Sequence, residues 1–260
     1  MSERSFAERT ESADRPLLEL RDIEAGYGRA ALVLRGLSVS VPAGTVVCLV
    51  GPNGAGKSTV LKVASGLLAP RSGAVRVDGK DVTGLSPQRM LAAGVAHVLQ
   101  GHSVFPEMTV AENVTLGAYT ITDRAQVAER VAFVQDLFPV VRERWRSLAG
   151  LLSGGQQKQV EFARSLMVSP KVLLLDEPSM GLDPKATAVV FEQVVAMREA
   201  GLAILLVEQN ARRALETADL GCVLDLGRVH ISGPAPKLLA DPQLAELYLG
   251  GRPTVSPESR

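Results

Sequence analysis

A chain of 260 residues can bury the core of one large domain, and 46% hydrophobic with 22% charged residues is ordinary for a globular protein. Lysine plus arginine and aspartate plus glutamate both number 28, so no overall charge favours nucleic acid or anionic lipid, and we expect no nucleic-acid partner. No apolar stretch approaches the roughly 20 residues of a membrane span, and residues 1–15 lack the apolar segment of a signal peptide.

The pattern along the chain predicts one domain between two tails. Residues 1–15 and 251–260 are rich in Ser, Arg, Glu and Pro, and we expect them to be disordered. Over residues 16–250, short β-branched runs alternate with amphipathic helical stretches, which predicts an α/β domain with a mainly parallel sheet. Cys48 and Cys222 lie in apolar segments without a CxxC partner, so we interpret both as buried free thiols.

The first part of this domain is rich in strands. Leu37, Val39 and Val41 alternate with serines, as in a half-buried strand. Residues 42–44, Pro-Ala-Gly, then turn the chain into the apolar run of residues 45–50. Later segments predict further strands at residues 74–77, 172–175, 203–207 and 221–226, and a helix at residues 184–200.

A glycine-rich loop follows the apolar run directly. It fits the pattern G-x-x-x-x-G-K-[ST], and a helix-like stretch comes after it and stops at Gly66. In that setting, backbone N–H groups and the positive helix N-terminus can hold phosphates. Lys57 can reach the β- and γ-phosphates, and the Ser58 hydroxyl can ligate Mg²⁺. The predicted ATP-binding residues of this loop are Gly51, Pro52, Asn53, Gly54, Ala55, Gly56, Lys57, Ser58 and Thr59.

The pattern becomes helical from about residue 106 to residue 150. Thr109 with Glu112, and Asp123 with Gln126, have the spacing of a capping box ahead of apolar-periodic stretches. These signals predict a helical subdomain inserted in the α/β domain.

A second candidate anion site, LSGGQ at residues 152–156, lies more than 90 residues beyond the first. Ser153 and Gln156 again have capping-box spacing, so the plain interpretation is a well-capped helix. However, two adjacent glycines are unfavourable at a helix start unless the backbone must approach something closely. The free N–H groups of Gly154 and Gly155, with the Ser153 hydroxyl, make a second anion site, whereas one nucleotide needs only one phosphate loop.

Two acids, Asp176 and Glu177, follow the predicted strand at residues 172–175. The carboxyl end of such a strand is where α/β folds place a carboxylate that binds Mg²⁺, and we assign that role to Asp176. Glu177 is then placed to orient and deprotonate an attacking water. The alternative, a strand ending in two solvated acids, is disfavoured by the phosphate loop upstream.

The phosphate loop, LSGGQ and LLLLDE in this order resemble the nucleotide-binding subunits of ABC transporters, from about Leu17 to Leu249. The resemblance implies a P-loop NTPase core of RecA-like topology, an antiparallel β subdomain and the inserted helical subdomain. It also implies ATP and Mg²⁺ as cofactors. Two chains, identical or different, would pair head to tail, and each would present Ser153, Gly154, Gly155 and Gln156 to the γ-phosphate held by the other.

The resemblance implies further roles for single residues. Tyr27 would stack on adenine, and the loop of residues 179–183 would cross the dimer interface. Gln100 would contact Mg²⁺ and the attacking water and sense the helical subdomain. Gln209 stands where the family commonly has a histidine that holds the γ-phosphate; its amide can donate one hydrogen bond but carries no charge. The predicted catalytic residues are therefore Glu177, Gln209 and Gln100.

Other phrases of the sequence indicate a subfamily. VFPEMTVAENV, VEQNARRALETAD and the terminal LYLG resemble one of two ATPases of branched-chain amino-acid importers, and importers of urea and short amides share much of this pattern. The resemblance implies a peripheral ATPase on the cytoplasmic side of the cell membrane. Transmembrane permease subunits would hold it there, and an extracytoplasmic solute-binding protein would act indirectly. A soluble ATPase of the same family, or the ATPase of a lipid or polysaccharide exporter, are the alternatives.

Overall fold

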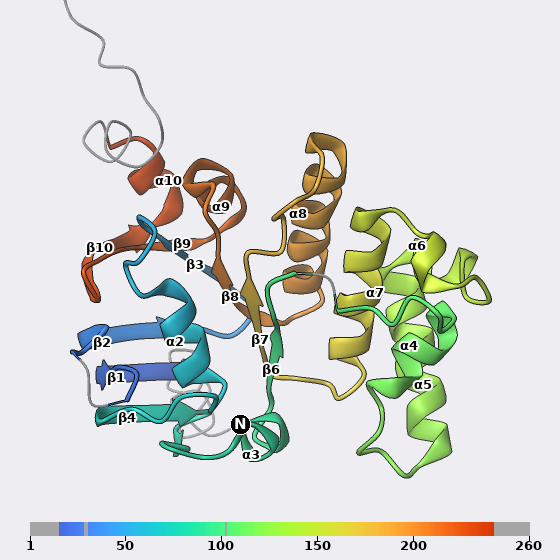
Figure 1. Ribbon diagram of the computed structural model, residues 1–260, viewed down its shortest axis with the longest axis horizontal. Coiled ribbons are helices and arrows are strands. Elements are labelled where there is room, and N and C mark those ends of the chain that lie inside the picture. The colour runs from blue at the N-terminus through green and yellow to red at the C-terminus, as the bar shows by residue number, and fades with distance from the viewer. Residues whose placement is uncertain (1–15, 29–30, 102, 242–260) are drawn as a thin grey trace, which may run out of the picture.

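The described residues form two β-sheets (Figure 1). The computed structural model describes residues 16–28, 31–101 and 103–241. The predicted tails, residues 1–15 and 251–260, and the LYLG segment, residues 247–250, lie outside this part of the chain. The larger sheet of the described residues consists of β3 (Val46–Val50), β6 (Val95–Val98), β7 (Val172–Asp176), β8 (Ala203–Val207), β9 (Leu220–Asp225) and β10 (Arg228–Pro234).

The larger sheet is mainly parallel, as predicted. Its strand order is β10-β9-β3-β8-β7-β6. Among the described strand pairs of this sheet, only β10 with β9 is antiparallel. Every residue of β3, β7 and β8 is buried, because these continuous apolar runs are covered on both faces. Because the three strands are parallel neighbours, their carboxyl ends meet at one edge of the sheet.

The smaller sheet is antiparallel and has the order β2-β1-β4-β5. Its predicted alternation is confirmed on β2, where Leu37, Val39 and Val41 are buried. The strand β1 was not predicted separately, because a register shift between Leu20 and Ile23 breaks its alternation. The strands are β1 (Leu18–Ala25), β2 (Leu34–Val41), β4 (Ser72–Val77) and β5 (Lys80–Asp81).

Each face of the larger sheet has its own hydrophobic core. On one face, α2 (Lys57–Ala64), α3 (Pro87–Ala92) and the smaller sheet contribute to the core that contains Val47 and Leu49 of β3. On the other face, α7 (Gly154–Leu166), α8 (Pro184–Glu199), α9 (Ala211–Thr217) and α10 (Ala235–Leu239) contribute to the core around Val46 and Cys48. Cys48 and Cys222 are buried and free, which confirms the interpretation of both thiols.

A group of helices lies beyond β6 at one side of the larger sheet (Figure 1). It contains α4 (Val110–Leu116), α5 (Arg124–Leu137), α6 (Pro139–Glu143) and the 3₁₀ helix η1 (Ala149–Leu151) before α7 begins. The Thr109–Glu112 capping box is formed, whereas Asp123 caps α5 through the backbone N–H of Ala125. None of the described helices is both long and apolar enough to cross a membrane.

Candidate functional site

The glycine-rich loop joins β3 to α2 at the carboxyl edge of the larger sheet. Gly51, Gly54 and Gly56 have positive φ, and Gly56 caps α2. A Cβ at Gly51 would lie 2.0 Å from the carbonyl oxygen of Leu224 in β9, so glycine is also required for packing there. The loop is tied to the β9–β10 turn through Ala55, whose carbonyl accepts from the Gly227 N–H at 3.0 Å.

The Lys57 ammonium lies folded back onto this loop. It donates to the carbonyl oxygens of Gly51 at 2.7 Å and Pro52 at 3.0 Å. Burial lowers the pKa of Lys57, and the nearby carboxylates of Glu177 and Asp176 oppose that shift. Within the described residues, both hydrogen bonds of this buried cation go to neutral carbonyls. The ammonium is therefore well placed to exchange them for a phosphate, because charge-assisted hydrogen bonds are stronger.

Ser58 and Asp176 meet beside the loop. The Ser58 hydroxyl donates to Oδ1 of Asp176 at 3.3 Å, and burial, followed by the charge of Glu177, raises the pKa of that carboxyl group. A hydroxyl and a carboxylate are the hard oxygen ligands that Mg²⁺ uses together with phosphate oxygens and water. The residues present therefore fit a Mg²⁺ ion that accompanies a nucleotide.

Glu177 has a strained backbone at the end of β7. Its φ of 45° is in the left-handed region, and its N–H donates to the Val207 carbonyl of β8 at 2.9 Å. Such a conformation costs about 1–3 kcal/mol and persists only where the surrounding structure holds it. The Glu177 carboxylate accepts from Nε2 of Gln100 at 3.1 Å, so the structure brings these two predicted catalytic residues together.

Two hollows share Glu177 as a lining residue. The first, of about 440 Å³, is otherwise lined by Val33, Asn53, Gly54, Gly56, Lys57, Ser58 and Thr59. The second, of about 320 Å³, is lined by Glu177 with Ser179, Met180, Glu208, Gln209 and Asn210. Phosphate loop, base candidate and Gln209 thus surround one region at the edge of the sheet.

Glu208 is a site residue that the sequence interpretation missed. It is buried, and its carboxylate accepts from the backbone N–H groups of Ser179 at 3.0 Å and Gln209 at 3.2 Å. Burial raises its pKa against the effect of these hydrogen bonds. The sequence pattern that would have predicted it is the one used for Asp176: an acid at the carboxyl end of a fully buried strand.

Tyr27 lies against α2, near the phosphate loop. Its hydroxyl is 3.3 Å from Oγ1 of Thr59 and accepts from Nζ of Lys62 at 3.2 Å. The Lys62 ammonium is also 5.2 Å from the centre of the Tyr27 ring. About half of the tyrosine is exposed, so the ring retains a free surface at the edge of the site.

The second candidate anion site lies apart from the first within the chain. Neither hollow is lined by Ser153, Gly154, Gly155 or Gln156. Ser153 and Gln156 form the predicted capping box at the start of α7. The close approach predicted for the glycines occurs at Gly155, where a Cβ would lie 2.9 Å from Cβ of Ala186 in α8.

Comparisons with known proteins match this chain to ATP-binding proteins of transporters. Residues 34–180 match the family model described as "ABC transporter". The branched-chain amino acid transport ATP-binding protein BraG of Pseudomonas aeruginosa is 38% identical, over 90% of this chain and 100% of BraG. The probable branched-chain amino acid transport ATP-binding protein LivF of Archaeoglobus fulgidus is 37% identical, over 90% of this chain and 99% of LivF.

A crystal structure of an ATP-binding cassette of an ABC transporter in its ADP conformation matches with a TM-score of 0.81 and 29% identity, over 91% of this chain and 100% of that one. Fold, motifs and relatives thus agree with the resemblance that the phosphate loop, LSGGQ and LLLLDE indicated. The chain belongs to the ABC transporter family, as an ATP-binding subunit with ATPase activity.

Proposed function

We propose that this ATPase powers the import of branched-chain amino acids, or of a related small polar solute, from the cytoplasmic face of a membrane. The observation that carries the proposal is the convergence of Lys57, Asp176 and Gln209 around Glu177 at one sheet edge. The identity of 38% and 37% to two branched-chain amino acid transport ATP-binding proteins, over 100% and 99% of their lengths, supports the solute class.

In the proposed reaction, Lys57 leaves the Gly51 and Pro52 carbonyls and pairs with the β- and γ-phosphates of ATP. Ser58, Asp176 and Gln100 would hold the Mg²⁺ ion, which when bound neutralises developing charge on the phosphates. The Glu177 carboxylate would take the proton of the attacking water, and its hydrogen bond with Gln100 fixes its direction.

The Gln209 amide would donate a hydrogen bond to the γ-phosphate oxygen, where charge grows in the transition state. Tyr27 would stack its exposed ring on the adenine. Residues 16–250 would act as one domain, with the inserted helical subdomain at residues 106–150.

The position of Ser153 supports a head-to-tail pair of chains. Because Ser153, Gly154, Gly155 and Gln156 line neither hollow of their own chain, they are available to the γ-phosphate held by a second subunit. The loop of residues 179–183 would cross that interface. The pair would be docked on two permease subunits, and the solute-binding protein would contact only the permeases.

A mixture of Lys57→Ala and Ser153→Ala chains tests this arrangement. Each variant alone should lose ATPase activity, because both of its composite sites are defective. In a mixed dimer both defects fall into one site, so we expect the other site to turn over and activity to return. If mixing restores no activity and Glu177→Gln stays monomeric with ATP at high concentration, the head-to-tail pair is wrong.

Transport itself is tested with the chain co-produced with its permeases in vesicles. We expect ATP-dependent uptake of labelled leucine that Lys57→Ala abolishes and that Lys80→Ala, on the exposed strand β5, leaves unchanged. Vesicles that hydrolyse ATP yet accumulate neither leucine nor urea nor short amides would contradict the import proposal and favour an exporter.

A further inference from the structure

A buried ion pair on α7 lies beside the segment that follows Gln100. Nζ of Lys158 is 2.5 Å from Oε2 of Glu161, one helical turn further on. Their side chains are only 3% and 0% exposed. Removing two charges from water is costly, and an apolar pair of similar volume is often at least as stable. The stability of α7 alone therefore does not account for these residues.

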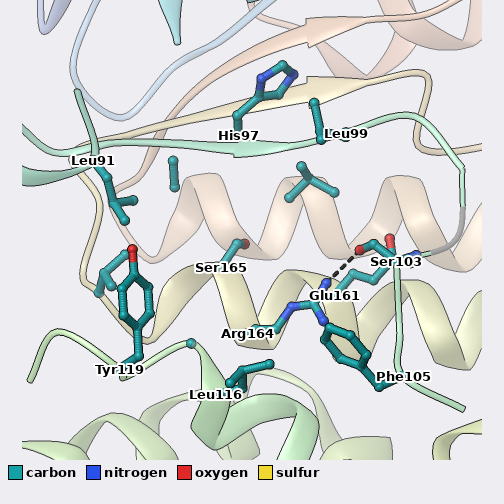
Figure 2. Close-up of a pocket in the computed structure, with 14 residues that line it drawn as sticks. Leu91, His97, Leu99, Ser103, Phe105, Leu116, Tyr119, Glu161, Arg164 and Ser165 are labelled. Atoms are coloured by element: carbon teal, nitrogen blue, oxygen red, sulfur yellow. Dashed lines mark hydrogen bonds between the residues drawn. The ribbon is translucent and has the colours of Figure 1, made fainter. Parts of the chain in front are cut away.

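Both members of the pair also bind backbone groups of the segment after Gln100. Nζ of Lys158 donates to the Gly101 carbonyl at 2.7 Å, and the Ser103 N–H donates to Oε1 of Glu161. Arg164, one turn beyond Glu161, donates from Nη2 to the Ser103 hydroxyl at 2.6 Å (Figure 2). Three charged groups of one helix thus hold the backbone and side chain of a segment about 60 residues earlier in the chain.

The same segment holds Gln100, whose amide contacts the catalytic region. Nε2 of Gln100 donates to Glu177 at 3.1 Å and lies 2.9 Å from Sδ of Met180. Gly101, the residue after Gln100, is the one that Lys158 anchors. A displacement of Gly101 would therefore move the Gln100 amide relative to Glu177, because only one peptide unit separates the two residues.

We propose that Lys158 and Glu161 are positioning residues for Gln100, and that they fix its amide against Glu177 from the helix that begins at Ser153. The inference rests on the catalytic role proposed for Gln100. It adds a physical connection between two elements that would serve different ATP molecules: Gln100 in the site of its own chain, and Ser153 at the site of the second chain. Movement of α7 against a partner's nucleotide would then be felt at Glu177.

This connection also reaches a cavity of about 430 Å³ between β6, α4 and α7 (Figure 2). Ser103, Glu161 and Arg164 are among the residues that line it. The hydrogen bonds of Ser103 with Glu161 and with Arg164 are therefore made within the wall of this cavity.

The test removes both charges together, so that neither is left buried and alone. Lys158→Met/Glu161→Leu keeps the volume apolar and should fold. We expect its kcat to fall by about 10- to 100-fold, as for a catalytic group that is slightly misplaced, while KM for ATP changes by less than about twofold. Hydrogen exchange of the peptide spanning residues 99–105 should accelerate, because the Ser103 amide loses its acceptor.

Two variants serve as matched controls. Arg212→Met/Glu216→Leu removes an exposed ion pair from α9 and should change neither readout. Val160→Ala opens a cavity in the buried face of α7 between the two charges, so it should lower the melting temperature without accelerating exchange at residues 99–105.

A double-mutant cycle with Gln100→Ala decides whether the pair acts through Gln100. If it does, the loss in kcat from the pair variant should disappear in the Gln100→Ala background. Normal kcat or unchanged exchange in the pair variant, or a full additional loss in that background, overturns the inference while leaving the ATPase proposal intact. A Gln100→Ala chain with normal turnover would instead refute the catalytic role of Gln100, and the inference with it.

Discussion

The phosphate loop and the Gln100 segment reach the same proposed catalytic region but are held there by different means. The loop follows β3, and Asp176 ends β7 in register with Val207 of β8, so backbone pairing in a buried sheet fixes their positions. Among the described residues that follow Gln100, residues 101 and 103–105 have no such ladder. Side chains of α7 hold Gly101 and Ser103, and Asn113 of α4 brackets Phe105 through bonds of 2.8 Å and 3.0 Å.

Because of this difference, residues at the strand ends are held rigidly, whereas the Gln100 segment can change its position more easily. A strand end can move only if the sheet moves, whereas the Gln100 segment depends on a few side chains from helices that lie beside the sheet. We therefore expect substitutions at strand ends to change the chemical step directly. Substitutions that release the segment should change how often the site is correctly assembled.

Glu177→Gln, at the end of β7, has the largest expected effect. We expect turnover to fall by about 10²- to 10⁴-fold, because the amide cannot accept the proton of the attacking water. ATP binding, measured by calorimetry, should remain. Glu192→Gln, on the exposed side of α8, is the control and should hydrolyse ATP normally. Near-normal phosphate release by Glu177→Gln would show that another group is the base.

Gln209→Ala tests the end of β8 in the same way, with a smaller effect. Losing one donor aimed at transition-state charge should lower turnover by about ten- to a thousandfold and leave ATP affinity nearly intact. Gln209→His should stay active and acquire a pH dependence near neutrality, because an unperturbed histidine titrates at about 6.5. An alanine variant with normal turnover would make the position structural.

The comparison also explains what the sequence could predict. The positions of the glycine-rich loop, Asp176 and Glu177 at the strand ends were predictable, because a glycine pattern or an acid stands at the end of an apolar strand and the local backbone places such residues. Lys158 and Glu161 gave no signal, since charges three residues apart on a helix usually face water. Their burial arises only when α7 packs beside the Gln100 segment.

Parts of the fold were hidden for related reasons. The strand β1 has a bulge at Arg21 and Asp22, so its alternation is broken. The capping box predicted at Asp123 and Gln126 is replaced by a bond to the nearer Ala125 N–H. In both cases local geometry, which a spacing rule does not contain, decided the outcome.

Glu208→Ala tests whether the carboxylate at the end of β8 holds the loop of residues 179–183. It leaves the backbone N–H groups of Ser179 and Gln209 without their acceptor, which should cost about 1–3 kcal/mol in the free energy of unfolding. Glu208→Gln keeps one acceptor oxygen and should lower the unfolding free energy by less than Glu208→Ala. Burial raises the pKa of Glu208, so it disfavours the charged carboxylate that the neutral amide replaces. Urea unfolding of both variants measures the difference, and equal losses would contradict this account.

The smallest effect is expected at His97, on the strand that leads to the Gln100 segment. Its ring points away from the cavity (Figure 2), and neither ring nitrogen has a hydrogen-bond partner within the described residues. Burial, and then the charge of Lys62, lowers its pKa from 6.5 to about 4. Between these values the unfolded chain binds a proton that the folded protein does not, so stability is complete above about pH 6.5 and falls as the pH falls towards about 4.

A shift of this size corresponds to at most about 3 kcal/mol, and partial access of water to the ring should reduce the loss to about 1–2 kcal/mol. His97→Leu removes the proton linkage, so its unfolding free energy should fall less than that of the wild type between pH 7 and pH 4.5. His230→Leu, on the exposed strand β10, controls for the loss of a histidine as such.

If hydrogen exchange at residues 99–105 also accelerates in acid only in the wild type, charging His97 loosens the segment through β6. Parallel pH profiles of the unfolding free energy for wild type and His97→Leu would show that protonation of His97 does not destabilise the fold. The side chains of α7 and α4 alone would then determine how firmly the Gln100 segment is held.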